Sequence, residues 1–253
     1  MLKSRLCIAF FAFAVGCAPA QKPLTDYVNP MLGTATLWDS VDLGFKPTKR
    51  TWGAEVFPGS SLPNAMVQVS PVTKFHSGAG YQYEDSVIYG FTHTNKGHWN
   101  LCHIPLLPVT GTPTPGDYCS PFSHERESAA PGYYQVFLDR YGVDAQLSST
   151  LRCAFHKYTY PAGAAASLLA DLQRSNEHVR AWDIRKEGDN VFAGWQQTGE
   201  KMYFYAVANR PVTGIEPVVE GDREVRIVRF GEGDGALELR IGFSFVSEKN
   251  ARE

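Results

Sequence analysis

The second half of the chain repeats one pattern, and that pattern restricts the fold more than any other feature. Runs of β-branched, aromatic or alternating apolar residues follow one another at roughly the 8–12-residue spacing of all-β domains. The runs are Tyr133–Leu138, Val143–Ser149, Leu151–Tyr160, Ala166–Leu172, Val191–Gln197, Met202–Ala208, Glu224–Phe230 and Leu237–Val246. No long helical period appears after the first 20 residues. We therefore predict an all-β fold, an antiparallel β-sandwich of two large packed sheets with long loops on one face.

The first half is less regular. Ala65–Ser70 alternates as a half-buried strand does, and Tyr81–Tyr83 with Val87–Tyr89 predicts a strand–turn–strand unit. Ile104–Val109 is apolar but contains two prolines, which predicts an edge strand or an irregular buried segment. The alanines of Ala162–Leu172 are also compatible with a helix, but we interpret the end of this range as a strand.

Residues 1–20 have the features of a targeting segment. A basic start precedes the apolar run Leu6–Val15, which is too short to span a bilayer. Ala18–Ala20 offers a small-x-small cleavage site, whereas Ala14–Cys17 resembles a bacterial lipobox that would make Cys17 the lipidated first residue. We favour the lipobox because Gly-Cys directly after the apolar run is the more specific arrangement. Both alternatives predict export, to the periplasm or as an outer-membrane or cell-surface lipoprotein, with membrane contact only through that lipid.

Charge and cysteine content exclude some functions. The net charge is −2, so the basic excess of a nucleic-acid-binding surface is lacking. Beyond the targeting segment, three cysteines remain: Cys102, Cys119 and Cys153. An odd number does not give a full disulfide framework. Cys102 and Cys119 could pair, or the thiols could stay free and buried. No Cys-x-x-Cys spacing supports a zinc ribbon.

The stretch Thr92–Asn100 lies between two apolar runs and is unusually rich in polar and aromatic chemistry. It contains His93, Asn95, Lys96, His98 and Trp99. No packed strand or amphipathic helix needs this mixture, so we predict a loop. Hydrogen-bonding groups around one flat aromatic ring suit a sugar, which has hydroxyls at its rim and C–H groups on one face. We predict that these five residues contact a carbohydrate and that Trp99 stacks on it.

Plainer alternatives exist for each of these residues. Trp99 could belong to the core or to an interface, and loop histidines are often structural. Asn95 and Lys96 could simply be solvated. We interpret His103, which lies nearer the following apolar run, as a hydrogen-bonded core or interface residue. The five-residue spacing of the three histidines does not match a helical metal pair, so we predict no metal site here.

Six motifs carry a family resemblance: Asp26–Thr34, Phe57–Pro71, Gly80–Tyr83, Ile88–Thr94, Gly97–Trp99 and Phe243–Ser247. Together they resemble the N-terminal domain of family 92 glycoside hydrolases, the calcium-dependent, inverting exo-α-mannosidases of bacteria. The motifs follow the order of the family across essentially the whole chain after the targeting segment. Gly97–Trp99 resembles the variant of α-1,2-specific members, in which the tryptophan lines the leaving-sugar subsite.

The resemblance implies a division of the protein. A β-sandwich would span residues 21–247, and residues 248–253 would begin a linker to a larger (α/α) barrel that this sequence lacks. The family's catalytic acid, catalytic base and calcium ligands belong to that barrel, so we assign none of them here. Glu55, Glu84 and Asp85 are interpreted as turn or surface carboxylates. The implied partners are mannose-containing glycans and the protein's own barrel.

Two other functions remain open at this stage. The chain could be a stand-alone carbohydrate-binding lipoprotein without catalytic activity. It could also be a purely structural domain that packs against the barrel without touching sugar.

Overall fold

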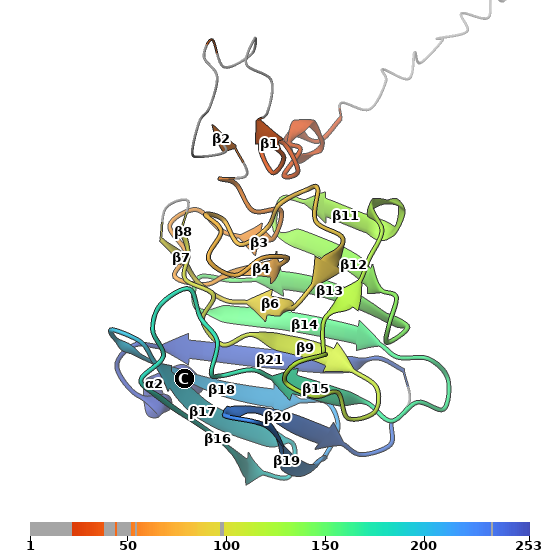
Figure 1. Ribbon diagram of the computed structural model, residues 1–253, viewed down its shortest axis with the longest axis vertical. Helices are drawn as coiled ribbons and strands as arrows, with labels where there is room; N and C mark the ends of the chain where they lie inside the picture. Colours follow the sequence, from red (N-terminus) through yellow and green to blue (C-terminus); the bar gives the residue numbers. More distant parts are fainter. Residues whose placement is uncertain (1–21, 38–43, 45–51, 54, 97–98, 234) are drawn as a thin grey trace, which may run out of the picture.

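Eight strands with one buried face form the larger of two antiparallel sheets (Figure 1). In spatial order they are β11 (Glu127–Ala130), β12 (Tyr133–Leu138), β13 (Val143–Ser149), β14 (Cys153–Thr159), β21 (Leu237–Ser244), β18 (Lys201–Ala208), β17 (Val191–Gln197) and β16 (Ala181–Gly188). Side chains along β12, β13 and β18 alternate strictly between buried and partly exposed. This alternation places the large apolar residues of each strand on one face.

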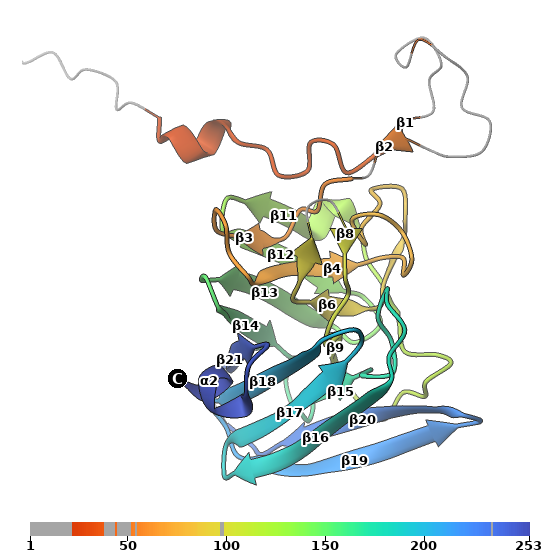
Figure 2. The ribbon, with the colours of Figure 1, turned by 90° about the vertical axis from the view of Figure 1, so that its left-hand side faces the viewer.

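Seven strands form the second sheet, which covers that apolar face (Figure 2). In spatial order they are β19 (Val212–Glu220), β20 (Arg223–Phe230), β15 (Ser167–Ala170), β9 (Leu106–Val109), β6 (Gly90–Thr92), β4 (Gln68–Val72) and β3 (Ser60–Ser61). One continuous core, with Phe91, Tyr134 and Phe204 among its largest buried side chains, fills the space between the sheets. The predicted antiparallel β-sandwich is confirmed.

This computed structural model describes residues 22–37, 44, 52–53, 55–96, 99–233 and 235–253. The predicted signal peptide and Cys17 lie outside these residues. The smaller elements are β1 (Thr36–Leu37), β2 (Trp52–Gly53), β5 (Val87–Ile88), β7 (Asn95–Lys96), β8 (Trp99–Asn100), β10 (Ser120–Pro121), two 3₁₀ helices (Leu24–Tyr27 and His124–Arg126) and α2 (Glu248–Arg252). No helix in this described part is long and apolar enough to cross a membrane.

Most of the strands were predictable. β12, β13 and β17 have the bounds that the sequence predicts, and Ala166–Leu172 contains β15 rather than a helix. β16 and β19 were not predicted. They are edge strands with many charged or exposed residues, so their apolar alternation is weak.

Three local predictions differ from the structure in whole or in part. Tyr81–Tyr83 is not a strand. Ile104–Val109 contains β9, which lies in the interior of its sheet between β15 and β6 rather than at an edge. All four β9 side chains are buried, and this burial outweighs the ladder hydrogen bond lost at one proline. Thr92–Asn100 includes the β7–β8 hairpin as well as loop. Of the two alternatives for the cysteines, the structure has free thiols: Cys102 is buried, Cys119 is partly exposed and Cys153 is exposed.

The register of the strands brings many connections to one end of the sandwich. In the larger sheet, the β13–β14 turn, the end of β21, the β17–β18 turn and the start of β16 are neighbours. In the smaller sheet, Thr92 at the end of β6 pairs with Ser70 of β4, and Phe91 of β6 pairs with Leu106 at the start of β9. The Leu151 carbonyl accepts hydrogen bonds from the N–H groups of Met66 and Val67, which joins the two sets. We call this the loop end; it contains residues 61–67, 93–96, 99–105, 149–153, 171–180, 197–201 and 244–247.

The short helix α2 packs on the outer face of the larger sheet, against β17, β18 and β21. Gly242 makes this packing possible, since a Cβ atom there would lie 2.0 Å from the Ala251 carbonyl oxygen. Gly199, in the β17–β18 turn, has open space around the same position.

We predict that Gly242→Ala lowers the free energy of unfolding by about 1–3 kcal/mol, because the methyl group must displace the α2 backbone. Thermal denaturation measures this as a fall in Tm of roughly 2–4 °C per kcal/mol. Gly199→Ala is the matched control and should leave Tm nearly unchanged. Equal Tm values for the two variants would contradict the packing of α2 described here.

Candidate functional site

The β7–β8 hairpin projects at the loop end and presents Trp99. Asn95 pairs with Asn100, and Lys96 pairs with Trp99. The Trp99 side chain is 46% exposed, so it lies outside the apolar core. The side chains of Asn95 and Lys96 and the whole of His98 lie outside the described part of the structure. A ring this exposed is accessible for stacking on a ligand or on a second domain.

Asn100 fixes the base of the hairpin from inside. Its side chain is buried, accepts from the Cys102 N–H (2.7 Å) and donates to Thr92 Oγ1 (3.1 Å). A Cβ atom at Gly80 would lie 2.3 Å from the Asn100 amide nitrogen, so only glycine leaves room for this amide. Cys102 and Ile104 both have a φ of 53°, a strained left-handed conformation for such residues. Together, these hydrogen bonds and backbone angles hold the segment directly after the hairpin.

Asn176 binds the hairpin to two other loops. Its Nδ2 donates to the Asn100 carbonyl oxygen (2.6 Å), and its Oδ1 accepts from the His76 N–H (2.6 Å). The Leu101 carbonyl accepts from the Asn176 N–H (3.1 Å) and from Ser175 Oγ (2.7 Å). We call this set of hydrogen bonds the Asn176 clamp. It holds the backbone beside Trp99 without any regular secondary structure.

A second network runs through His103, which is 3% exposed. Its Nε2 lies 3.2 Å from a Glu177 carboxylate oxygen, and its Nδ1 lies 2.9 Å from Thr94 Oγ1. Because a carboxylate accepts, Nε2 carries the proton and Nδ1 accepts from the threonine. Thr198 also donates to Glu177 (2.6 Å). Burial lowers the pKa of His103, and the nearby carboxylate of Glu177 opposes that shift. The network joins the hairpin to the β17–β18 turn, in agreement with a hydrogen-bonded structural role for His103.

His93 lies behind the hairpin, inside the sandwich. Its ring is fully buried, with Nε2 3.1 Å from His156 Nε2 and the Phe243 ring centroid 4.6 Å away. His156 Nδ1 lies 2.5 Å from the hydroxyl of Tyr158. The sugar contact predicted for His93 finds no support in this geometry, which favours the alternative of a structural histidine. Burial lowers the pKa of His93 to about 3 and also lowers that of His156.

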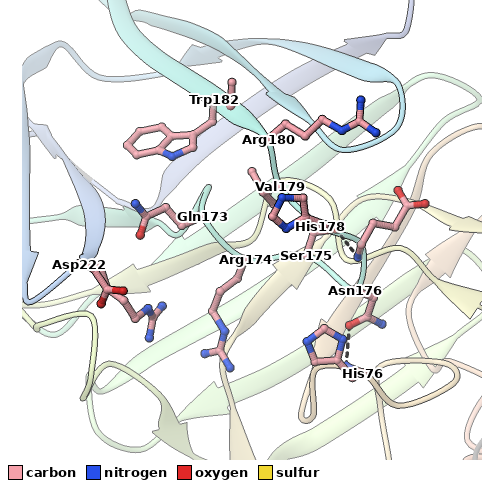
Figure 3. Close-up of a pocket in the computed structure, with 13 residues that line it drawn as sticks. His76, Gln173, Arg174, Ser175, Asn176, His178, Val179, Arg180, Trp182 and Asp222 are labelled. Carbon is pink, nitrogen blue, oxygen red and sulfur yellow. Dashed lines mark hydrogen bonds between the residues drawn. The ribbon is translucent and has the colours of Figure 1, made fainter.

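A polar groove of about 970 Å³ opens beside the Asn176 clamp (Figure 3). It is lined by His76, by residues 173–182, and by Asp222 and Arg223. The sequence analysis did not identify this site. The available signal was the nearly uninterrupted polar run Gln173–Arg180 directly after a buried strand, at the same end of the sheet as Thr92–Asn100.

Large apolar side chains are exposed around the same loop end. They are Leu62, Trp99, Leu151, Phe245 and Val246. Exposed large apolar side chains that gather on one surface are typical of an interaction site. The loop end therefore combines a braced aromatic hairpin, a polar groove and several exposed apolar side chains.

Comparison with known families identifies the fold. The sequence model of the glycosyl hydrolase family 92 N-terminal domain matches residues 27–249. The chain belongs to this family. The resemblance seen in the six motifs is thereby confirmed. A comparison with curated protein sequences gives no significant match.

Solved structures agree with this assignment. The family GH92 α-mannosidase BT3965 from Bacteroides thetaiotaomicron has 25% identity and a TM-score of 0.77, over 92% of this chain and 35% of its own length. The GH92 family glycosyl hydrolase CcMan5 has 26% identity and a TM-score of 0.66, over 78% of this chain and 31% of its own. The inverting mannosidase BT2199, also from B. thetaiotaomicron, shares the fold at 22% identity and a TM-score of 0.73 over 92% of this chain and 33% of its own. The family 92 N-terminal domain thus spans about a third of these relatives.

The acids Glu84 and Asp85 of this family 92 N-terminal domain take part in loop contacts. Among the residues that the structure describes, no group of three or more His, Cys, Asp or Glu side chains could hold a metal ion. Glu84 accepts from the Thr36 N–H (2.8 Å), and Asp85 accepts from Thr73 Oγ1 (2.7 Å). These carboxylates brace loops, and the described residues do not fit the calcium that the family implies.

We predict that acid destabilises the domain through the buried His93–His156 pair. A histidine with a pKa of about 3 when folded and 6.5 when unfolded binds fewer protons in the folded state, so stability falls as pH drops below 6.5. For His93 the loss is about 2 kcal/mol at pH 5 relative to pH 8. Urea denaturation at the two pH values measures it.

His93→Gln should reduce this loss, whereas the exposed His178→Gln should leave it unchanged. An identical pH dependence in the wild type and in His93→Gln would show that the buried pair is not the cause.

We also predict that Asn176→Ala loosens the hairpin. Losing its two side-chain hydrogen bonds at 2.6 Å costs about 1–2 kcal/mol locally, so amide hydrogen exchange at Asn100 and Leu101 should accelerate about tenfold. Asn190→Ala removes a comparable bond to the Ala208 carbonyl at the opposite end of the sandwich. Its exchange at Asn100 should match the wild type. Unchanged hydrogen exchange in Asn176→Ala would show that the Asn176 clamp does not stabilise the hairpin.

Proposed function

We propose that this domain takes part in the hydrolysis of terminal α-mannose from glycans by an exo-acting inverting enzyme. Its β7–β8 hairpin forms one wall of a pocket whose other wall belongs to a catalytic (α/α) barrel. The observation that carries the proposal is Trp99, half-exposed on a hairpin that the Asn176 clamp holds in place. Membership of the family supports it, as does the α-mannosidase activity named for BT3965.

The proposed preference for one glycosidic linkage rests on the same residue. Gly97–Trp99 resembles the motif of α-1,2-specific members, so we propose that the indole of Trp99 stacks on the leaving sugar of an α-1,2-linked pair. His98, Asn95 and Lys96 complete the contact in this proposal. His93 supports them only from the core, because its ring is buried.

The chemical step belongs to the other domain. An inverting glycosidase places an acid and a base about 6.5–9.5 Å apart, with room for one water between them. Glu84 and Asp85 are engaged in loop contacts, so we assign neither role to them. Calcium, as the family implies, would be held by the barrel. The exposed apolar side chains of the loop end support docking of that barrel here.

The last part of the proposal concerns the location of the protein in the cell. We propose that the chain is exported under the direction of residues 1–20 and anchored through a lipid on Cys17, at the periplasmic or outer surface of a bacterium. The supporting observation is Gly-Cys directly after a short apolar run. Metabolic labelling with a radioactive fatty acid tests it, and Cys17→Ser should abolish the label.

Trp99→Ala tests the central role in a protein that joins this chain to a family 92 catalytic domain. We expect kcat/KM on α-1,2-mannobiose to fall at least about tenfold, equal to ~1.4 kcal/mol of transition-state binding. The control is Trp195→Ala, because Trp195 lies on β17 in the larger sheet, where the Lys201 ammonium covers its ring at 3.8 Å. Unchanged kinetics in Trp99→Ala would favour a purely structural domain.

The chain without a catalytic domain provides the complementary control. It should show no turnover with calcium present, and mannobiose should not bind at Trp99 alone. Unaided binding of mannobiose at Trp99 would favour the stand-alone carbohydrate-binding protein instead.

A further inference from the structure

The polar groove beside the Asn176 clamp is lined by residues that the structure describes in this chain. Its lining comes from the connection between β15 and β16, from the β19–β20 turn and from His76 (Figure 3). Its volume of about 970 Å³ lies at the upper end of the range found for small-molecule sites.

Several of its polar side chains are held in place by partners outside the groove. Arg223 donates to Asp171 (2.7 Å) and to the Pro115 carbonyl (2.7 Å). Arg174 donates to the Tyr118 hydroxyl (3.1 Å), and its guanidinium lies 4.1 Å from the Phe75 ring centroid. Each guanidinium has five N–H groups and uses only some of them in these contacts. The groove therefore offers fixed donors, which reduces the entropy cost of binding.

Gln173 adds an amide that is oriented in the same way. Its Oε1 accepts from the Glu224 N–H (2.8 Å), which fixes the amide plane. The NH₂ group at the other end of the amide is a donor. Gln173 and Trp182 both line the groove (Figure 3), and the Trp182 ring packs against the core with the Arg226 guanidinium 5.2 Å from its centroid. Donors beside a flat apolar ring are the combination that a sugar needs, with oxygens at its rim and C–H groups on its face.

The charges of the groove nearly cancel. Arg174, Arg180 and Arg223 line it, together with the acids Glu177 and Asp222. The buried carboxylate of Asp171 pairs with Arg223 from below. An anion site would need an uncompensated positive charge. The balance favours a neutral ligand that is rich in hydroxyl and ether oxygens.

We propose that this groove is a second glycan-binding site, which takes a neutral oligosaccharide along Trp182 with Arg174, Arg223 and Gln173 as donors. The choice of a mannose oligosaccharide among neutral glycans rests on the function proposed above. Asn176 lines the groove and also clamps the hairpin, so the site lies next to the Trp99 wall. It holds sugar units beyond those at the cleavage point.

Indole NMR signals of the ¹⁵N-labelled full chain test the proposal, because the sequence has only five tryptophans. The probe is α-1,2-linked mannotetraose, with inorganic phosphate as the anionic comparison. Mannotetraose should shift the Trp182 indole signal saturably and leave that of Trp195 in place. Phosphate should shift neither. No saturable shift at Trp182, or a shift with phosphate alone, overturns the proposal.

Surface variants give a second test that does not depend on refolding a core position. His178→Ala with Arg180→Ala removes two exposed groove residues and should weaken mannotetraose binding about tenfold. Arg240→Ala, an exposed arginine on β21, should not weaken it. Equal affinity in all three proteins contradicts the groove assignment.

The two proposals fail separately. Unchanged kinetics of Trp99→Ala would contradict the shared pocket but would not affect the proposal of binding at Trp182. Loss of the groove site would leave the Trp99 kinetics as they are.

Discussion

The packing of two antiparallel sheets on one apolar core is the constraint on which the rest of the structure depends. Every second side chain of β12, β13 and β18 is buried, and a shift of one residue in any of them would expose its whole apolar face. The register is therefore fixed, and so are the positions at which the strands end. Those positions bring the hairpin, the polar loop after β15 and the β17–β18 turn to one end of the molecule. The sandwich serves as the scaffold of the loop end.

Rigidity at the loop end has a different origin. The connections there have little regular structure, so side chains supply the hydrogen bonds that strands would otherwise make. Asn176 and His103 each join segments that are far apart in the sequence, and Asn100 fills the space that a glycine leaves open. The result is an exposed aromatic ring on a fixed backbone, which suits the proposed shared pocket because ordering a loop on binding would cost affinity. The exposed apolar side chains around it are suited to the proposed contact with a second domain.

The sequence predicted the sandwich well, but it could not predict the contacts that shape the candidate site. Tyr133–Leu138 and Val191–Gln197 were recognisable because a half-buried strand has a local period. Edge strand β16 was missed because solvent, rather than a core, faces much of it. Local composition pointed to Trp99. It could not reveal that His93 faces inward or that Asn176 reaches Asn100, since both facts arise from contacts between distant segments. The six motifs gave the family, which no periodicity could have done.

The central claim is that this domain supplies one wall of a mannose pocket through Trp99. The most direct measurement is a crystal structure of the chain joined to a family 92 catalytic domain, with a non-hydrolysable α-1,2-mannobiose analogue bound. The account predicts carbon atoms of the leaving sugar within about 4 Å of the Trp99 ring. An analogue bound in the barrel with the Trp99 ring turned away, packed only against protein, would contradict it.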